Sequence, residues 1–205
     1  AGASPQQCIE AEAALADAYS AVNLLPEAVA LYDKVAARAL EIDAPVERAR
    51  AALDGARALL RMGHGDAAQQ RLAEARQLFE AQDNAASVAL TDLALAHAEL
   101  RAGRPADALD SAERASAALA RSGVTSWLLE AEVAGAEAAA ALGLAAQAHS
   151  RLQRALQQAQ LLGLGTVTLV CHQGLGRLAA SRGDVAQARQ HLHMALALID
   201  RSRVA

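Results

Sequence analysis

A period of 40 residues runs through this chain and restricts its fold more than any other feature. Gly63, Gly103, Gly143 and Gly183 follow one another at steps of 40, and Asn23 begins the series. The chain contains only 13 glycines in 205 residues, so four glycines in one such column are not an accident of composition. A repeat of this length is the signature of stacked supersecondary units, each of which buries its apolar face against the next.

Three further columns of small residues follow the same period, which indicates helices that cross closely. Alanine makes up more than a quarter of the chain, so a single alanine column proves little, but the joint alignment with the glycines is decisive. Close crossing of two helices needs little side-chain bulk at the contact. The columns are Ala16, Ala56, Ala96, Ala136 and Gly176; Ala28, Ala68, Ala108, Ala148 and Ala188; and Val35, Ala75, Ala115, Ala155 and Ala195.

Each 40-residue unit is predicted to form two helices. In the second unit, Pro45 suits a first helical turn, Val46 to Met62 contains few helix breakers, and a glycine-containing turn follows. The next helix is expected from about Ala67 to Ala81, with Asp66 as its cap. The segment 166–170 is rich in β-branched residues and would suit a strand, but its place in the period predicts a helix.

The expected fold is all-α: a right-handed superhelical solenoid of five helix–turn–helix repeats, with the first helix of each repeat on the concave side. We expect a single domain over 1–205, with repeats at about 5–44, 45–84, 85–124, 125–164 and 165–205. The sequence has no initiator methionine, which predicts that it is part of a longer protein.

The residues around the fifth turn resemble the tetratricopeptide repeat (TPR). The run from Leu175-Gly176 to Gly183-Asp184, followed by Ala188, matches the family signature, and Tyr19 and Tyr32 supply its aromatic pair in the first unit. The common period is about 34 residues. The longer spacing here resembles the repeats of Leu-Gly-Asn repeat proteins, kinesin light chains and bacterial regulators. The resemblance implies a module that binds proteins.

Two features extend this resemblance to bacterial regulators. The ending from Ala195 to Arg203 resembles the last repeat before a CHAT (caspase-like) protease domain, and signal-transduction ATPases carry similar arrays. In that case the chain would be the sensing or regulatory arm of a larger enzyme. The excess of alanine and arginine, with Lys34 as the only lysine, also suggests a bacterial source.

Composition argues against several classes of partner. The formal net charge is -4 with acidic and basic residues mixed, so nucleic acid is not expected as a partner. The sequence contains neither an apolar run long enough for a membrane span nor a signal peptide. Two cysteines are too few for a disulfide framework, and a reducing cytoplasm is expected.

No residue pattern predicts catalysis, a metal or a cofactor. His191 and His193 lie about 200° apart around one helix, so they cannot face a single metal. Cys171 belongs to a column of small residues and is expected to be a buried side chain, and nothing marks it as a nucleophile, which would need a base and an oxyanion donor. We therefore predict no catalytic, metal or cofactor site and expect a protein that is not an enzyme.

The concave face is the candidate binding surface. Arg50, Arg57 and Arg61 are seven and eleven residues apart, so they share one stripe of a helix and could bind carboxylates. This predicts a peptide or protein partner that is acidic in its middle part, and the alternative is a solvated helix face. By family analogy the partner-binding residues are Arg50, Arg57, Arg61, Leu90, His97, Arg101, Glu130, Glu137 and Arg177.

Overall fold

The structure is a computed structural model that describes the backbone of residues 4–204 and the side chains of residues 4–201. Every regular element in this part of the chain is an α-helix, which confirms the all-α prediction. Residues 166–170 lie inside a helix, as their place in the period predicted. The ten helices of the described residues are α1 (Pro5–Ala21), α2 (Leu25–Glu41), α3 (Pro45–Met62), α4 (Gly65–Glu80), α5 (Ala85–Arg101), α6 (Pro105–Ser122), α7 (Thr125–Ala141), α8 (Ala145–Leu161), α9 (Gly165–Ser181) and α10 (Val185–Val204).

The glycine column forms the turn between the two helices of a repeat. Gly63 adopts a left-handed conformation with φ +84°, which glycine enters without a steric penalty. The N–H of His64 donates to the Leu59 carbonyl at 2.9 Å, and the N–H of Gly63 donates to the Leu60 carbonyl at 3.1 Å. These two bonds satisfy carbonyls at the end of α3 in a Schellman motif. Asn23, with φ 64°, takes the equivalent place in the first repeat.

The turn between one repeat and the next has its own column, which the sequence analysis missed. Asp43, Asp83, Gly123 and Gly163 are again 40 residues apart, and all four have positive φ. Aspartate tolerates the left-handed region better than most residues, so it can replace glycine there. The column was hidden because only two of its members are glycine.

The start of α4 differs from the prediction. The helix begins at Gly65, and Asp66 lies in its first turn instead of capping it. The carbonyl of His64 already accepts from the N–H of Ala68 at 3.1 Å, so the helical bonding starts earlier than Asp66 could initiate it. Side-chain caps do occur at other helices, where Ser4 and Asn84 accept from backbone N–H groups.

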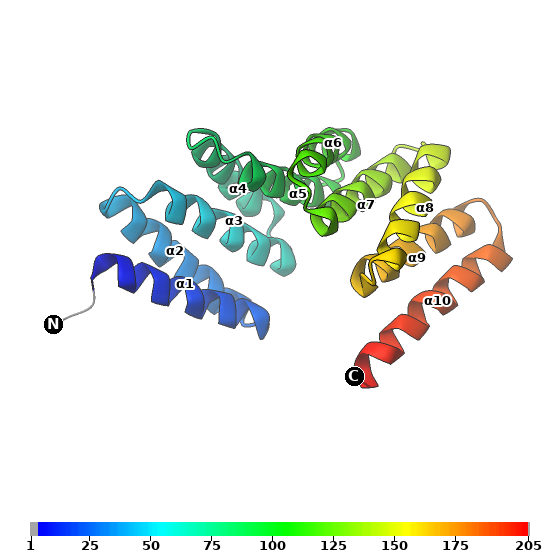
Figure 1. The fold of residues 1–205 in the computed structure, drawn as a ribbon, viewed down its shortest axis with the longest axis horizontal. Coiled ribbons are helices and arrows are strands. Elements are labelled where there is room, and N and C mark those ends of the chain that lie inside the picture. Colours follow the sequence, from blue (N-terminus) through cyan, green and yellow to red (C-terminus); the bar gives the residue numbers. More distant parts are fainter. Residues whose placement is uncertain (1–3, 205) are drawn as a thin grey trace. The chain divides into compact units, whose positions relative to one another are not determined.

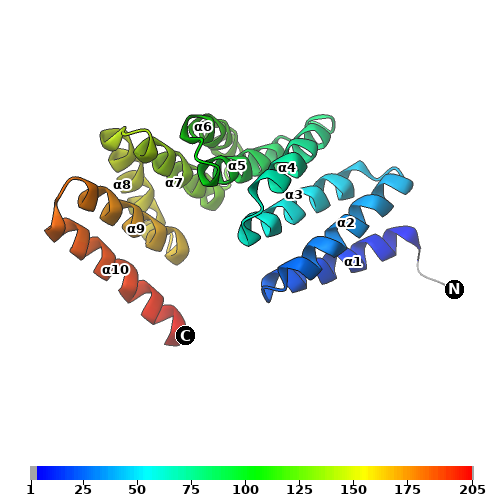
Figure 2. The same cartoon turned by 180° about the vertical axis from the view of Figure 1, so that it is seen from behind.

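The chain divides into two compact units, one ending at Ala102 and the other beginning at Gly103. In the first unit, α1 to α5 pack in sequence order, and α3 also touches α1 and α5. In the second unit, α6 to α10 pack in the same way, and α7 also touches α9. Figures 1 and 2 show this side-by-side stacking of consecutive helices from opposite sides within each unit. Each unit is therefore a short stack of helical hairpins.

The small columns lie where the helices meet, as predicted. Ala16, Ala56, Ala96 and Ala136 each have 0% of their surface exposed, and Gly176 is buried at the equivalent place. The other two columns are also buried throughout. Larger side chains fill the space beside them: Leu72 and Phe79 in the first unit and Leu152 in the second.

Two glycines inside first helices make room for arginines. A Cβ at Gly135 would lie 2.7 Å from Nη1 of Arg151, and a Cβ at Gly55 would lie 2.9 Å from Nη1 of Arg71. The third repeat has Leu95 and Ser111 at the positions of Gly135 and Arg151. Glycine in a helix costs up to about 1 kcal/mol against alanine, so its presence here reflects the space that the guanidinium needs.

This pairing leads to a testable exchange. We expect Gly135→Leu to destabilise the protein by about 1 kcal/mol, because the new side chain would displace the Arg151 guanidinium from its ion pairs with Glu113 and Glu132. Adding Arg151→Ser, which copies the pair of the third repeat, should recover about half of that loss. Urea denaturation followed by circular dichroism would measure both, and additive effects of the two substitutions would contradict the steric explanation.

Candidate interaction clefts on the first helices

Two clefts lie between first helices of consecutive repeats, one in each unit. The α1–α3 cleft has a volume of about 420 Å³, and the α7–α9 cleft has a volume of about 410 Å³. The α1–α3 cleft is lined by Gln6, Ile9, Glu10, Ala13, Ala14, Asp17, Tyr32, Val35, Val46, Glu47, Arg50, Ala51 and Asp54. The α7–α9 cleft is lined by Ala136, Glu137, Ala140, Leu152, Gly174, Arg177, Leu178 and Ser181.

The two clefts occupy the same place in the repeat. Asp17 and Glu137 lie in one column of the 40-residue period, and so do Tyr32 and Leu152. In both clefts small and aliphatic residues line the floor and charged residues lie at the edge. A recess that recurs at equivalent positions is a property of how the repeats stack.

Carboxylates dominate the edge of the α1–α3 cleft. Glu10, Asp17, Glu47 and Asp54 line it, whereas Arg50 is its one cation among the lining residues. The carboxylate Oδ1 of Asp17 accepts a hydrogen bond from the hydroxyl of Tyr32 at 2.7 Å, which fixes the position of this side chain. The local charge is therefore negative, although Arg50 remains exposed beside it.

Burial shifts the protonation equilibria in this cleft. Burial raises the pKa of Tyr32 above its ordinary value, and the hydrogen bond to Asp17 raises it further. Burial also raises the pKa of Asp54; Arg57 lowers it, and the nearby Asp17 carboxylate raises it again. The negative charge in this cleft is thus only partly compensated, and a further cation would be stabilised there.

The α7–α9 cleft has an ion pair at its edge and a tightly packed floor. The guanidinium of Arg177 on α9 is bound to the carboxylate of Glu137 on α7. A Cβ at Gly174 would lie 2.9 Å from Cδ1 of Leu152, so glycine at this position lets α9 approach α8. Glu137 and Arg177 were both predicted as binding residues, and the structure brings them together.

The predicted arginines of the first unit have partners within the chain. Arg57 Nη1 lies 3.1 Å from Asp54 Oδ1. The Nη1 group of Arg61 donates to the backbone carbonyl of Ser20 at 2.9 Å, and Arg101 donates to the carbonyl of Leu60. Arg61 and Arg101 lie in one column of the period, and each satisfies a carbonyl near the end of the preceding first helix. These two arginines therefore join consecutive repeats.

The remaining predicted residues differ in exposure. Arg50 has the most accessible guanidinium of the arginine stripe, with 75% of its side chain exposed and its Nε 3.9 Å from Asp54 Oδ2. Leu90 and His97 on α5 and Glu130 on α7 are half-buried and lie outside both clefts. Trp127, at the start of α7, is also half-buried. Of the predicted residues, Arg50 thus lines the α1–α3 cleft, and Glu137 and Arg177 line the α7–α9 cleft.

A polar position on the first helices, buried at Asp92 and His172 and half-buried at Glu12 and Glu132, was missed by the sequence analysis. Glu12, Asp92 and Glu132 lie in one column of the period, and the fifth repeat has His172 there. Each of the three acids faces a cation of a neighbouring second helix. Glu12 pairs with Lys34 at 2.6 Å and with Arg38 at 2.8 Å, Asp92 Oδ1 lies 3.0 Å from Arg76 Nε, and Glu132 lies 3.8 Å from both Arg151 and Arg154. The recurrence of an acidic residue at this position in three repeats is the sequence signal that could have predicted these ion pairs.

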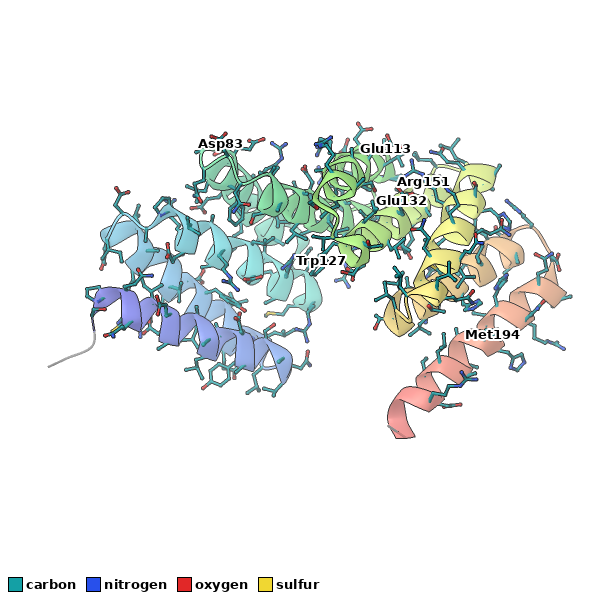
Figure 3. All side chains as sticks on the ribbon, in the orientation of Figure 1. Asp83, Glu113, Trp127, Glu132, Arg151 and Met194 are labelled. Carbon is teal, nitrogen blue, oxygen red and sulfur yellow. The ribbon has the colours of Figure 1, made fainter. Side chains whose placement is uncertain are left out.

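A third recess lies between second helices, where α6, α7 and α8 meet. Figure 3 shows Glu113, Glu132 and Arg151 close together there, in a cleft of about 460 Å³. Arg151 is bound to Glu113 at 2.5 Å and has only 13% of its side chain exposed. The charges of this cleft are therefore balanced within the chain, and we assign it a structural role.

Cysteines and groups of metal-binding side chains are the remaining features considered for chemistry. Burial raises the pKa of Cys171 to about 11, so its thiol is protonated at neutral pH. Cys8 and Cys171 are both free. Within residues 4–201, no three histidine, cysteine or acidic side chains are grouped to hold a metal ion. In the same part of the chain, no helix has the length and apolarity that a bilayer crossing requires.

Comparison with solved structures supports the TPR-like architecture. No family model and no curated protein matches the sequence. The TPR-like repeats of a kinesin light chain protein from Podosopora anserina superpose with a TM-score of 0.77 at 20% identity, covering 100% of both chains. BtubC from P. vanneervenii gives a TM-score of 0.76 at 18% identity, covering 95% of this chain and 81% of that one.

A third similar structure belongs to a signalling protein. A signal-transduction ATPase with numerous domains and a tetratricopeptide repeat sensor, from Pyrococcus horikoshii, gives a TM-score of 0.79 at 14% identity. The match covers 96% of this chain and 31% of that chain. At such identities the likeness concerns the fold alone. It confirms that this chain is an all-α, TPR-like helical-repeat solenoid.

Proposed function

We propose that this chain is a protein-interaction module that binds a peptide segment or a partner domain along its first helices. The observation that carries the proposal is the recurrence of one cleft, at equivalent positions, in the α1–α3 and α7–α9 regions. A partner whose side chains enter such recesses is held by shape, and the charged edges select its sequence. Catalysis is not part of this proposal, because the hydroxyl that lies beside a carboxylate, that of Tyr32 next to Asp17, is made less acidic by burial, which raises its pKa.

The charges of the α1–α3 cleft support a partner segment that carries both signs. The exposed guanidinium of Arg50 suits an acidic residue, which agrees with the partner predicted from the sequence. The carboxylates of Glu10, Asp17 and Asp54 suit a basic residue beside it. We therefore propose a peptide with an acidic and a basic residue close together, and we do not expect nucleic acid or a membrane as the partner.

The role of a regulatory arm is a second candidate. It is supported by the likeness to the signal-transduction ATPase whose tetratricopeptide repeats are described as a sensor. In this case the module would belong to a larger bacterial, cytoplasmic protein, with a CHAT-type protease or an ATPase beyond its ends.

Binding to a peptide array would test the interaction module. Ten-residue peptides of acidic, basic, mixed and neutral composition would be probed with the full chain and with Ala13→Phe, which places a ring in the α1–α3 cleft. We expect mixed-charge peptides to bind best, and Ala13→Phe to weaken them at least about tenfold by filling the recess. Arg50→Glu should weaken peptides with an acidic residue selectively.

Ala37→Phe is the matched control, because Ala37 is exposed on α2 and lies outside the cleft. This variant should bind as the unchanged protein does. Equal losses in the two phenylalanine variants, or no preference among the four classes of peptide, would contradict a binding role of this cleft.

A further inference from the structure

A contact between two histidines joins α9 and α10. Nδ1 of His172 lies 3.0 Å from Nδ1 of His191, and the two ring centroids are 5.3 Å apart. His172 has only 5% of its surface exposed, and its Nε2 is buried with no hydrogen-bond partner. At this distance one Nδ1 donates and the other accepts, so at least one Nδ1 must be unprotonated. The contact is therefore incompatible with two imidazolium rings.

The preceding repeat has an ion pair at the same place. Glu132 and Arg151 lie 40 residues before His172 and His191, and Glu132 Oε2 lies 3.8 Å from Arg151 Nη1. A carboxylate and a guanidinium keep opposite charges from about pH 5 to pH 12. Two imidazoles instead gain like charges as the pH falls below about 6.5. The fifth repeat has thus replaced a pH-independent pair by a titratable one.

The surroundings oppose protonation of this pair. Burial lowers the pKa of His172, and the charge of His191 lowers it further. Burial also lowers the pKa of His191, and the charge of His149 on α8 lowers it further. Cys171, next to His172, is neutral because burial raises its pKa to about 11.

The charged groups of the neighbouring helices do not compensate a second imidazolium. On α7, Glu132 and Glu137 are already bound to cations of α8 and α9. On α10, Arg189 and His193 are each two positions from His191, which places them on the opposite side of the helix. Among the described side chains, no carboxylate contributes to the shift of either imidazole, and the one further charge that acts on His191 is that of His149 on α8.

We propose that the His172–His191 contact is a pH-sensitive latch, which holds α10 on α9 at neutral pH and releases it when both rings are protonated. Both pKa values are lower with the helices docked than in the released state, so the released state binds more protons. The stabilisation is therefore complete above about pH 6.5 and is lost as the pH falls from there through the lowered values. Release would uncover α9 around Gly176, where a Cβ would lie 3.1 Å from Cγ of Leu192.

Amide hydrogen exchange of the full chain at pH 7.5 and pH 5.0, corrected for the intrinsic exchange rates, would test the latch. We expect the protection of α10 to fall at least about tenfold at the lower pH, while α2 to α4 keep theirs within about twofold. The double variant His172→Glu, His191→Arg rebuilds the pair of the preceding repeat. Its α10 should show no more than about a twofold change.

His193→Gln is the matched control, since His193 is exposed on α10, and it should retain the full fall. If the double variant does not fold, His191→Gln replaces it: this side chain still hydrogen-bonds but takes up no proton, so the fall should shrink. Unchanged α10 protection in the unaltered protein would overturn the proposal. So would equal falls in the unaltered and substituted chains, or a fall spread evenly over all helices.

Discussion

Replacement of Leu72 by alanine is expected to lower the free energy of unfolding by about 3 kcal/mol, because it leaves a cavity in a core that cannot collapse fully. Leu72 has 0% of its surface exposed and lies among Ala68, Ala75 and Phe79, where α3, α4 and α5 pack. The side chains of Ala68 and Ala75 are too short to move into the space that the leucine leaves. Urea denaturation monitored by circular dichroism at 222 nm would measure the loss.

Leu161→Ala is the control for this substitution. Leu161 also lies in a second helix, but 81% of its surface is exposed, so the free energy of unfolding should change by no more than about 0.5 kcal/mol. Because leucine and alanine have similar helix propensities, the difference between the two variants reports packing. A loss below about 1 kcal/mol for Leu72→Ala would contradict the packing at the crossing of these helices.

Removal of the Asp92 carboxylate should also cost about 2 kcal/mol in the free energy of unfolding, since the half-buried guanidinium of Arg76 then keeps only its exposed partner Glu80 at 2.7 Å. Asp92 has only 4% of its side chain exposed, and its Oδ1 accepts from Nε of Arg76 at 3.0 Å. This pair connects α4 with α5, one repeat with the next. The measurement is again urea denaturation, applied to Asp92→Ala.

Two further variants separate the buried pair from a surface pair. Asp107→Ala removes a carboxylate that is 57% exposed and 3.9 Å from Arg104, and it should change the stability by less than about 0.5 kcal/mol. Exchange of both partners, Arg76→Met with Asp92→Leu, should restore most of the loss, because no buried charge remains and Glu80, the second partner of Arg76, is 46% exposed. Equal losses for Asp92→Ala and Asp107→Ala would show that burial of the pair contributes nothing.

Much of the fold could be predicted because its determinants repeat. The left-handed turn at Gly63 and its equivalents needs glycine or asparagine, and the buried crossing at Ala56 and its equivalents needs little bulk. Each requirement concerns a single position of the repeat, so the five repeats show the same residue preference five times. The second turn column was missed because Asp43 and Asp83 stand where Gly123 and Gly163 stand later.

The contacts of the predicted arginine stripe were predictable only in part. The period places Arg50, Arg57 and Arg61 on one stripe of a helix, but it does not specify which neighbour each guanidinium binds. Arg61 donates to the Ser20 carbonyl on α1, whereas Arg57 binds Asp54 on its own helix. Long, flexible side chains choose among several acceptors of similar energy, and the packing of the neighbouring helices decides among them.

The sequence by itself determined the secondary structure, the turn positions and the close helix crossings, because left-handed turns and small contacts are local requirements repeated at a fixed spacing. Only the tertiary structure showed the buried ion pairs, the two equivalent clefts and the contact between His172 and His191. Each of these features brings together side chains from different helices. The distance between two helices depends on the packing of their whole faces, so it cannot be read from any single position in the sequence.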